Sequence, residues 1–219
     1  PSVRTAYNGK LNLSGSLVIA VSQSGAAADA LEIIKTGNAN GCITVAITNF
    51  PDSPVAKEAK HHLWCDCGLE KSVAATKTYT TSLYLLAAIV ANWSKDEGLL
   101  SMLANVPKIA EETLAAVEHF DSLATRFRYM NECFYLARGY MYPMAMEASL
   151  KIQETCYVRA RAYAVSDFHH GPFAMINDNM PVFFYLCDKA TDKDVLEMVT
   201  KVKNAGGDAI VFSNKQEYC

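Results

Sequence analysis

A short run of apolar, largely β-branched residues, Leu17 to Val21, is the feature that most restricts the fold of this chain. Such a run is typical of a strand that is covered on both faces in a parallel sheet. It is followed by Ser22-Gln-Ser-Gly25 and then by residues 26–35, whose Ala and Leu content predicts a helix. A second strand is predicted over residues 43–48. Strand, helix and strand in this order predict a right-handed βαβ unit.

The rest of the chain continues this alternation. A third strand is predicted near residues 63–65 and a long apolar helix over residues 74–95. Further on, strands are predicted over residues 134–137, 182–187 and 209–212, and helices over residues 144–157 and 192–204. Between the halves, residues 107–129 alternate charged and apolar side chains at helical spacing, which indicates a linking helix. Because both halves repeat one order of elements, we expect two similar α/β lobes.

The composition restricts the class of protein. Of the 219 residues, 51% are hydrophobic and 20% are charged, which is typical of a globular protein and excludes disordered and collagen-like classes. The formal charge is −3 and Lys and Arg do not cluster, which disfavours nucleic-acid binding. The longest apolar run, Leu83 to Trp93, is shorter than the roughly 20 residues of a membrane helix. No secretory leader precedes the first strand, so we expect a cytoplasmic protein.

The seven cysteines are scattered through apolar segments, which favours reduced, buried thiols over a disulfide framework. One group, His61, His62, Cys65 and Cys67, combines residue types that bind metals. Its spacing fits no usual zinc pattern, and Cys65 and Cys67 are interpreted as one face of a short strand. We therefore expect neither a metal nor another cofactor.

The segment Ser22-Gln23-Ser24-Gly25 lies where the first predicted strand meets its helix. In an open parallel sheet, ligands bind at this point. Free N–H groups of the first helical turn, the helix dipole and two hydroxyls could hold a phosphate dianion, and Gly25 would let the backbone approach it. The alternative is that Ser24 only caps the helix. The corresponding loop of the second half, residues 188–192, has no such Ser/Gly run, so we expect a single phosphate site.

Three charged residues lie at helical spacing within residues 144–157. Glu147, Lys151 and Glu154 are at i, i+4 and i+7, so they form one stripe on a helix that is apolar on nearly every other side. Because such a helix is typically buried, we expect the stripe to face a cleft, where unpaired charges would cost several kcal/mol. The alternative is a self-paired ladder with no chemical role.

His169-His170-Gly171-Pro172 predicts a turn that presents imidazole side chains. A histidine that titrates near neutrality suits proton transfer to a sugar ring oxygen, and a surface histidine without a role is the alternative. The anion-binding loop, the carboxylates with a lysine, and the histidine together suit a phosphorylated sugar whose ring opens. A carboxylate would then move a proton between neighbouring carbons while a cation stabilises the oxyanion that develops.

Five segments, taken in order, resemble a known family. They are Ser22-Gln-Ser-Gly25, Val73-Ala-Ala-Thr-Lys-Thr-Tyr-Thr80, Ala137-Arg-Gly-Tyr-Met-Tyr-Pro143, Met146-Glu-Ala-Ser-Leu-Lys-Ile-Gln-Glu154 and His170-Gly-Pro172. With their spacing, they resemble the sugar isomerase (SIS) double-domain family. Within it, they are similar to the isomerase half of glutamine–fructose-6-phosphate aminotransferase and to SIS-type glucosamine-6-phosphate deaminases. The resemblance extends from about Leu17 to Phe212.

The resemblance implies two flavodoxin-like SIS lobes, each a parallel sheet flanked by helices. We expect the first lobe over residues 1–105, a linking helix over residues 106–130 and the second lobe over residues 131–219. The N-terminal part of the first lobe and the C-terminal part of the second are expected to be missing.

The resemblance also assigns roles to individual residues. Ser22, Gln23, Ser24 and Gly25 match the family's phosphate-binding loop, and Lys77 lies in a segment that lines the substrate region. Glu154 matches the carboxylate that moves the proton between carbons 1 and 2, with Glu147 and Lys151 near the open-chain sugar. His170 matches the ring-opening histidine, which in relatives comes from the neighbouring subunit. A homodimer with shared active sites and a phosphosugar substrate are therefore expected.

The sequence departs from the aminotransferase pattern at several positions. Ala27 replaces a phosphate-binding Thr, Ala75 replaces Ser, and Asp167-Phe-His-His replaces Glu-Leu-Lys-His. The family's first Gly-Thr-Ser segment, its C-terminal tail and a cysteine glutaminase domain do not occur in this sequence, which disfavours a glutamine-dependent synthase. We expect an aldose–ketose isomerase of an aminosugar phosphate, similar to glucosamine-6-phosphate deaminase. The alternatives are the aminotransferase's isomerase half, a deglycase of fructosamine phosphates and a non-catalytic sugar-phosphate sensor.

Overall fold

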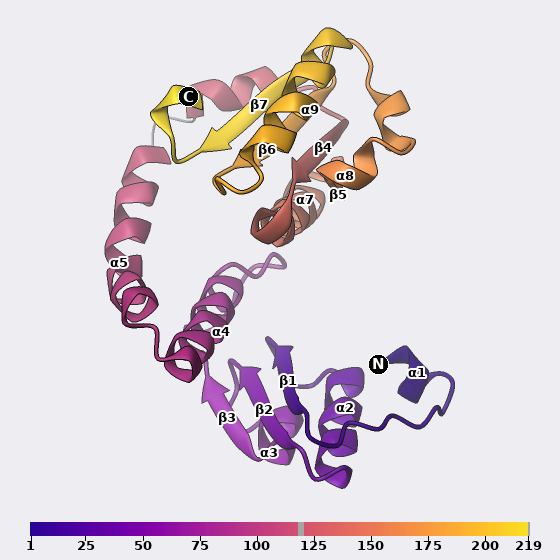
Figure 1. The fold of residues 1–219 in the computed structure, drawn as a ribbon, viewed down its shortest axis with the longest axis vertical. Helices are drawn as coiled ribbons and strands as arrows, with labels where there is room; N and C mark the ends of the chain where they lie inside the picture. The colour runs from indigo at the N-terminus through magenta and orange to yellow at the C-terminus, as the bar shows by residue number, and fades with distance from the viewer. Residues whose placement is uncertain (118–120, 219) are drawn as a thin grey trace. The chain divides into compact units, whose positions relative to one another are not determined.

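The computed structural model describes residues 1–117 and 121–218, and these two ranges form two compact units (Figure 1). Each unit contains one parallel β-sheet with helices packed against it. The predicted fold class, two α/β lobes with parallel sheets, is thereby confirmed.

The first unit contains a three-stranded sheet in the order β1-β2-β3. Its strands are β1 (Leu17–Ser22), β2 (Ile43–Thr48) and β3 (His61–Trp64), and its helices are α1 (Ser2–Thr5), α2 (Ala28–Ala39), α3 (Pro54–Glu58), α4 (Lys77–Ser94) and α5 (Glu97–Val117). Val18 and Ala20 of β1 pack with Ile34 of α2 and Val55 of α3 in one core. Helix α3 begins where Ser53 caps it, because the Ser53 hydroxyl accepts a hydrogen bond from Ala56 N–H.

The second unit contains a four-stranded sheet in the order β5-β4-β6-β7. Its strands are β4 (Glu132–Ala137), β5 (Arg159–Ala164), β6 (Pro181–Leu186) and β7 (Asp208–Ser213), and its α-helices are α6 (Asp121–Ala124), α7 (Tyr142–Cys156), α8 (Val165–Phe168) and α9 (Asp192–Asn204). Short 3-10 helices cover Thr125–Phe127, Gly139–Met141, Pro172–Met175 and Gln216–Tyr218.

Helices cover both faces of the second sheet. Neighbouring residues of β4 point to opposite sides of it, so the cores that they join show which helix lies on which face. Phe134 packs with Val195 of α9 in one core, whereas Tyr135 packs with Ala145 of α7 in another. The connections β4-α7-β5 and β6-α9-β7 therefore lie on opposite faces, and the strand order reverses between β4 and β6. Such a topological switch point leaves a crevice at the carboxyl ends of the two strands.

Strand β5 was not predicted from the sequence. Residues 159–164 read Arg-Ala-Arg-Ala-Tyr-Ala, which has no apolar run. β5 is an edge strand that pairs only with β4 among the described strands. Arg159 and Arg161 are exposed while Ala160 is buried, so the alternation is that of a half-solvated strand.

The linking segment also differs in detail from its prediction. Helix α5 begins at Glu97, and Pro107 lies inside it. The sequence interpretation placed the start of the linking helix at Pro107 because charged and apolar side chains alternate at helical spacing from there. Helix is confirmed from there to Val117, residues 118–120 lie outside the described residues, and the short helix α6 and a 3-10 turn follow. In the first unit, β3 ends at Trp64, so Cys65 and Cys67 follow the strand and do not lie in it.

Among the described residues, no helix is both long and apolar enough to cross a membrane.

Candidate functional site

The loop after β1, Ser22 to Gly25, is folded as a tight turn in front of α2. Gly25 N–H donates to the Ser22 carbonyl at 3.2 Å and lies 3.1 Å from the Ser22 hydroxyl. Gly25 has a φ of +62°, a value that glycine adopts without strain. The turn is held from outside by β2 and α3, because Asn49 N–H donates to the Gln23 carbonyl at 3.1 Å and Val55 N–H to the Gly25 carbonyl at 3.0 Å.

Ser24 is not the cap of the helix that follows. The N-cap of α2 is Ala27, which makes no side-chain capping bond, and the Ser24 hydroxyl accepts from Ala26 N–H at 3.2 Å. The helical ladder begins with Leu31 N–H, which donates to the Ala27 carbonyl at 3.0 Å. The N–H groups of the first turn therefore precede the ladder and carry the positive end of the helix dipole. These N–H groups favour an anion-binding role for the turn over the alternative in which Ser24 only caps the helix.

The segment that contains Lys77 is held by a residue that the sequence analysis missed. Oε1 of Glu70 accepts hydrogen bonds from Thr76 N–H at 3.0 Å, Thr78 N–H at 2.9 Å and the Thr78 hydroxyl at 2.8 Å. The bonds from Thr78 and Thr76 lower the pKa of Glu70. Lys77 Nζ donates to the Leu69 carbonyl at 2.9 Å, so this side chain links the two ends of residues 69–77. A carboxylate several residues before a helix gives no local sequence signal for such capping.

Helix α7 brings Glu147, Lys151 and Glu154 together as predicted. Lys151 Nζ lies 2.5 Å from Glu154 Oε2 and 3.4 Å from Glu147 Oε1. The three side chains are between 21% and 26% exposed, so water is only partly excluded from them. The ladder is therefore self-paired, and it carries one negative charge in excess.

The lysine in this ladder is held in its charged form. Burial by itself would lower the pKa of Lys151, but the hydrogen bond to Glu154 and the charge of Glu147 outweigh it and raise the pKa. A lysine that stays protonated can stabilise negative charge that develops on a substrate oxygen.

The expectation that α7 is buried on nearly every side is wrong. Its apolar residues Met146 and Leu150 are 52% and 44% exposed, and Ala145 and Ser149 are its buried residues. The face of α7 that contains Ala145 and Ser149 packs on β4 and β5. The face that contains Met146 and Leu150 is apolar and exposed. The apolar composition of the helix predicted too much burial, because composition does not show how many other elements pack against a helix.

His169 and His170 follow α8 in an exposed turn that is anchored by aromatic rings on both sides. Phe168 packs edge-on against Phe134 at 5.3 Å and against Phe173 at 6.2 Å between ring centroids. Burial, with the charges of Lys201 and His170, lowers the pKa of His169. The predicted presentation of imidazoles in a turn is what the structure has, whereas their chemical role stays a prediction.

The elements that carry Glu154 and His170 pack on different faces of the second sheet. Helix α7 packs on the Tyr135 face of the sheet, whereas Phe168, which anchors the histidine turn, packs on the Phe134 face. No contact joins Glu154 and His170 among the residues that the structure describes.

The switch point of the second unit offers carboxylates where the first unit offers hydroxyls. Asp188 Oδ1 accepts from Ala190 N–H at 3.0 Å, and Arg138 pairs with Asp194 at 2.6 Å. Asp192 is buried and pairs with Lys215. Residues 188–192 have no Ser/Gly run like that of residues 22–25, and a single phosphate site stays a prediction.

Three of the four residues weighed as metal ligands have partners within the protein. His62 Nε2 lies 2.9 Å from the Thr48 hydroxyl, Cys65 Sγ lies 3.7 Å from the Ser82 hydroxyl, and Cys67 Sγ lies 3.3 Å from Asn49 Oδ1. Within residues 1–117 and 121–218, no group of three or more His, Cys, Asp or Glu residues is placed to hold a metal ion.

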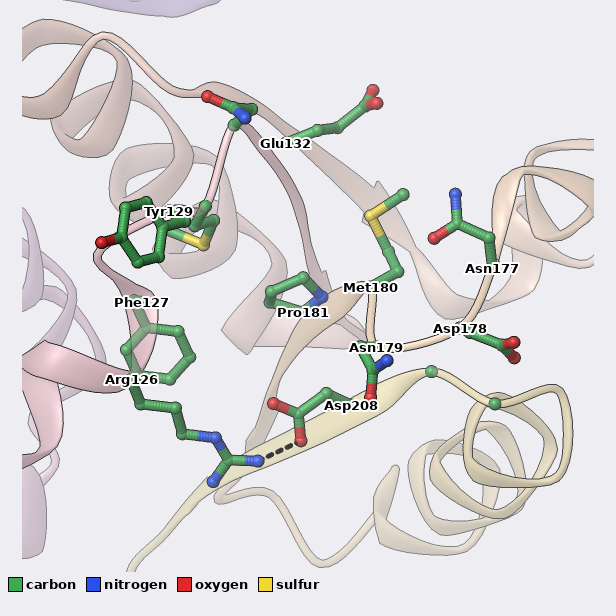
Figure 2. A pocket seen from close by; sticks show the side chains of 14 residues that line it. Arg126, Phe127, Tyr129, Glu132, Asn177, Asp178, Asn179, Met180, Pro181 and Asp208 are labelled. Atoms are coloured by element: carbon green, nitrogen blue, oxygen red, sulfur yellow. Dashed lines mark hydrogen bonds and ion pairs between the residues drawn. The ribbon is translucent and has the colours of Figure 1, made fainter.

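A cavity of about 610 Å³ lies at the amino ends of β4, β6 and β7 (Figure 2). Arg126 on one wall donates to Asp208 at 2.5 Å, and Tyr129, Asn177 and Asp178 line other parts. None of the site residues predicted from the sequence is among its described lining residues. In parallel sheets, ligands bind at the carboxyl ends of strands, so we do not place the candidate site here.

Comparison with known proteins agrees with the geometry. The model of the SIS domain family matches residues 11–92 and again residues 127–218. The two matched ranges fall one in each unit, which explains the repeated order of elements.

Several individual proteins are similar to this chain. The glutamine–fructose-6-phosphate aminotransferase (isomerizing) of Aquifex aeolicus is 36% identical over 76% of the chain, and that of Wigglesworthia glossinidia brevipalpis is 32% identical over 91%. The solved C-terminal domain of glucosamine-fructose-6-phosphate aminotransferase from Francisella tularensis is 29% identical, with a TM-score of 0.86 over 91% of this chain and 59% of that one. The chain spans 28% and 34% of the length of the two aminotransferases. On the two family matches and the shared fold, this chain belongs to the SIS domain family.

Proposed function

We propose that this chain carries the sugar-binding and proton-transfer machinery of a phosphosugar aldose–ketose isomerase that acts on an aminosugar phosphate. The observation that carries the proposal is the SIS domain match over both units, together with Glu154 and Lys151 on one partly buried face of α7. This places a carboxylate base and a cation within one hydrogen bond of each other. The enediol chemistry of an aldose–ketose isomerisation needs that pair.

The proposed step moves one proton between carbons 2 and 1, and a second proton from the amino or hydroxyl group on carbon 2 to oxygen 1. Glu154 removes the proton from carbon 2 of the open-chain aldose and returns it to carbon 1, while Lys151 stabilises the oxyanion that forms between the two events. With an amino group on carbon 2, the product is a ketose imine. Water then attacks that carbon, and ammonia leaves to give the ketose phosphate.

The proposed phosphate end is the Ser22–Gly25 turn. Hydroxyls of Ser22 and Ser24 and the first-turn N–H groups of α2 offer donors to a dianion, and Ala27 does not occupy those donors with a capping side chain. Gln23 is exposed beside them. We assign Ser22, Gln23, Ser24 and Gly25 to phosphate binding, as the family resemblance implies.

His170 is the proposed ring-opening acid, supplied by a second copy of the chain. Its anchor and α7 lie on opposite sheet faces, which supports a site shared between the copies of a homodimer. Lys77 and the segment before it are assigned to the sugar side of the substrate region.

The fate of the nitrogen separates the two leading candidates. A deaminase releases ammonia, whereas an aminotransferase half uses nitrogen supplied by another domain. Identity above 30% to two aminotransferases favours the second candidate, and that observation is why we keep it beside the first. A sensor that binds without turnover is less well supported, because it would not need the Glu147–Lys151–Glu154 ladder.

The proton step can be tested without deciding the nitrogen's fate. We would incubate the protein with fructose 6-phosphate in D₂O and follow deuterium entry at carbons 1 and 2 by mass spectrometry. We expect wash-in for the wild type and a loss of at least about 100-fold in Glu154→Gln, since the base is removed. Release of ammonia from glucosamine 6-phosphate in the same samples would favour the deaminase.

A matched control is available on helix α5. Glu112 forms an i, i+4 pair with Lys108 at 3.8 Å, but both side chains are largely exposed. Glu112→Gln should leave deuterium wash-in within twofold of the wild type. Equal wash-in by Glu154→Gln and the wild type, or none by the wild type, would remove the proposal.

A further inference from the structure

Asn49, the residue after β2, is a buried polar residue with several partners. It is 7% exposed. Its side-chain Nδ2 donates to the Gly68 carbonyl at 2.7 Å, and its Oδ1 accepts from Cys67 N–H at 3.2 Å. Its backbone carbonyl accepts from Trp64 Nε1 at 3.2 Å. Asn49 is therefore fixed by hydrogen bonds in three directions.

These bonds join two segments that are far apart in sequence. The backbone N–H of Asn49 donates to the Gln23 carbonyl in the Ser22–Gly25 turn. The side chain of Asn49 holds residues 67 and 68, where the loop leading to Lys77 begins. The far end of that loop is tied by Glu70 to Thr76 and Thr78. One residue thus connects the proposed phosphate turn with the proposed sugar-side segment.

We propose that Asn49 is a positioning residue that sets the Lys77 loop in register with the phosphate turn, an inference that rests on the proposed function. It acts through the residues it holds and does not itself touch substrate. Asparagine suits the place because its amide both donates to Gly68 and accepts from Cys67. An aspartate could not donate to the Gly68 carbonyl, and an alanine would remove the partner of both the Gly68 carbonyl and the Cys67 N–H.

The two links differ in how a substitution affects them. The bond to Gln23 uses the backbone, so it survives a change of the side chain. The bonds to residues 67 and 68 use the side chain and are lost. Asn49→Ala should therefore leave phosphate binding intact while it displaces the loop that faces the sugar. A general loss of stability would not separate these two effects.

The test compares Asn49→Ala with a matched asparagine. Asn38 is a partly buried asparagine of the first unit, where Nδ2 donates to the Glu58 carbonyl at 2.8 Å and Oδ1 accepts from the Thr44 hydroxyl at 2.7 Å. It lies in the last turn of α2, at the other end of that helix from Ser24. Asn38→Ala removes the same chemistry away from the proposed site.

For the full-length protein, kcat for deuterium wash-in and the Kd of fructose 6-phosphate by calorimetry would be measured for each variant. Asn49→Ala should lose about tenfold in kcat, with Kd within about twofold of the wild type. Asn38→Ala should change neither. Equal effects of the two variants, or a Kd that weakens in parallel with kcat, would overturn the positioning role.

Hydrogen exchange separates a failure of this inference from a failure of the proposed function. If the wild type shows no wash-in, the proposed function fails. The inference is then judged on amide exchange, which should become faster in residues 66–78 and not in residues 22–26 for Asn49→Ala alone. Unchanged exchange in residues 66–78 would refute it. If Asn49→Ala does not fold, Asn49→Ser is measured in its place, since serine keeps a polar group there.

Discussion

Gly25 and Ser53 approach each other so closely that a β-carbon on residue 25 would lie 2.0 Å from the Ser53 hydroxyl and 2.5 Å from its Cβ. The approach brings the cap of α3 against the turn proposed to bind phosphate. Glycine is therefore required at position 25 for space as well as for its positive φ.

Gly25→Ala should destabilise the first unit by about 3 kcal/mol, because backbone strain and overpacking add. Gly41→Ala is the control, since Gly41 also has a positive φ, +72°, but its β-carbon would meet open space. We expect about 1 kcal/mol for the control, from strain alone. The chain's two tryptophans, Trp64 and Trp93, lie in this unit, so urea unfolding followed by their fluorescence measures both values. Equal losses for the two variants would show that the contact with Ser53 is not limiting.

The ladder on α7 predicts a pH dependence at alkaline pH. Because the folded state raises the pKa of Lys151 above its ordinary value of 10.5, the lysine's contribution to stability is complete below that pH and is lost as pH rises through the folded pKa. The difference in unfolding free energy between the wild type and Lys151→Met should be constant up to about pH 10 and fall above it. Circular dichroism during urea unfolding measures it, with Lys108→Met as an exposed control. A difference that grows with pH would contradict the pairing.

Glu70 predicts the opposite dependence at acid pH. Its pKa is lowered by hydrogen bonds from Thr78 and Thr76, so its contribution is complete above its ordinary value of 4.5 and is lost as pH falls through the lower folded pKa. Wild-type stability should therefore decline more steeply below pH 4.5 than that of Glu70→Gln. Tryptophan fluorescence reports on this unit, and Glu111→Gln, an exposed change on α5, serves as the control. Parallel pH profiles for the wild type and Glu70→Gln would mean that the carboxylate charge does not hold the loop.

Much of the fold follows from local sequence, and particular residues show why some of it does not. Strands with an apolar run, such as β1 and β6, were predicted with boundaries within a residue or two, although β1 is an edge strand of its sheet and only Val18 and Ala20 of it are buried. β5 was missed because an edge strand needs only one apolar face, which Ala160 and Ala162 supply without a hydrophobic run. The start of α5 was misplaced because the alternation of charged and apolar side chains begins only at Pro107, which lies inside the helix.

The candidate site divides in the same way. The spacing of Glu147, Lys151 and Glu154 fixes their contact, since residues three and four apart on a helix are neighbours. Asn49 and Glu70 were not found, because their roles depend on hydrogen bonds to other segments of the fold. The self-pairing of the ladder and the exposure of Met146 likewise depend on packing that spacing does not encode.

The sharing of one site between two copies of the chain gives the last prediction. Glu154→Gln and His170→Asn should each be inactive alone. If Glu154 of one copy works with His170 of the other, a mixed dimer has one site with both changes and one intact site. Equal mixing with subunit exchange makes half of the dimers mixed, so about a quarter of the wild-type activity should return.

The control for this experiment is a pair of changes on one helix. Glu154→Gln and Lys151→Met both lie on α7, so every site of their mixed dimer contains one change and no activity should return. The readout is deuterium wash-in after the two purified variants are mixed and allowed to exchange. Because Glu154 and the anchor of His170 lie on opposite faces of one sheet, recovery in the first mixture alone is the result expected. No recovery, with exchange verified by mass spectrometry of tagged copies, would place both residues in the site of a single chain or exclude His170 from it.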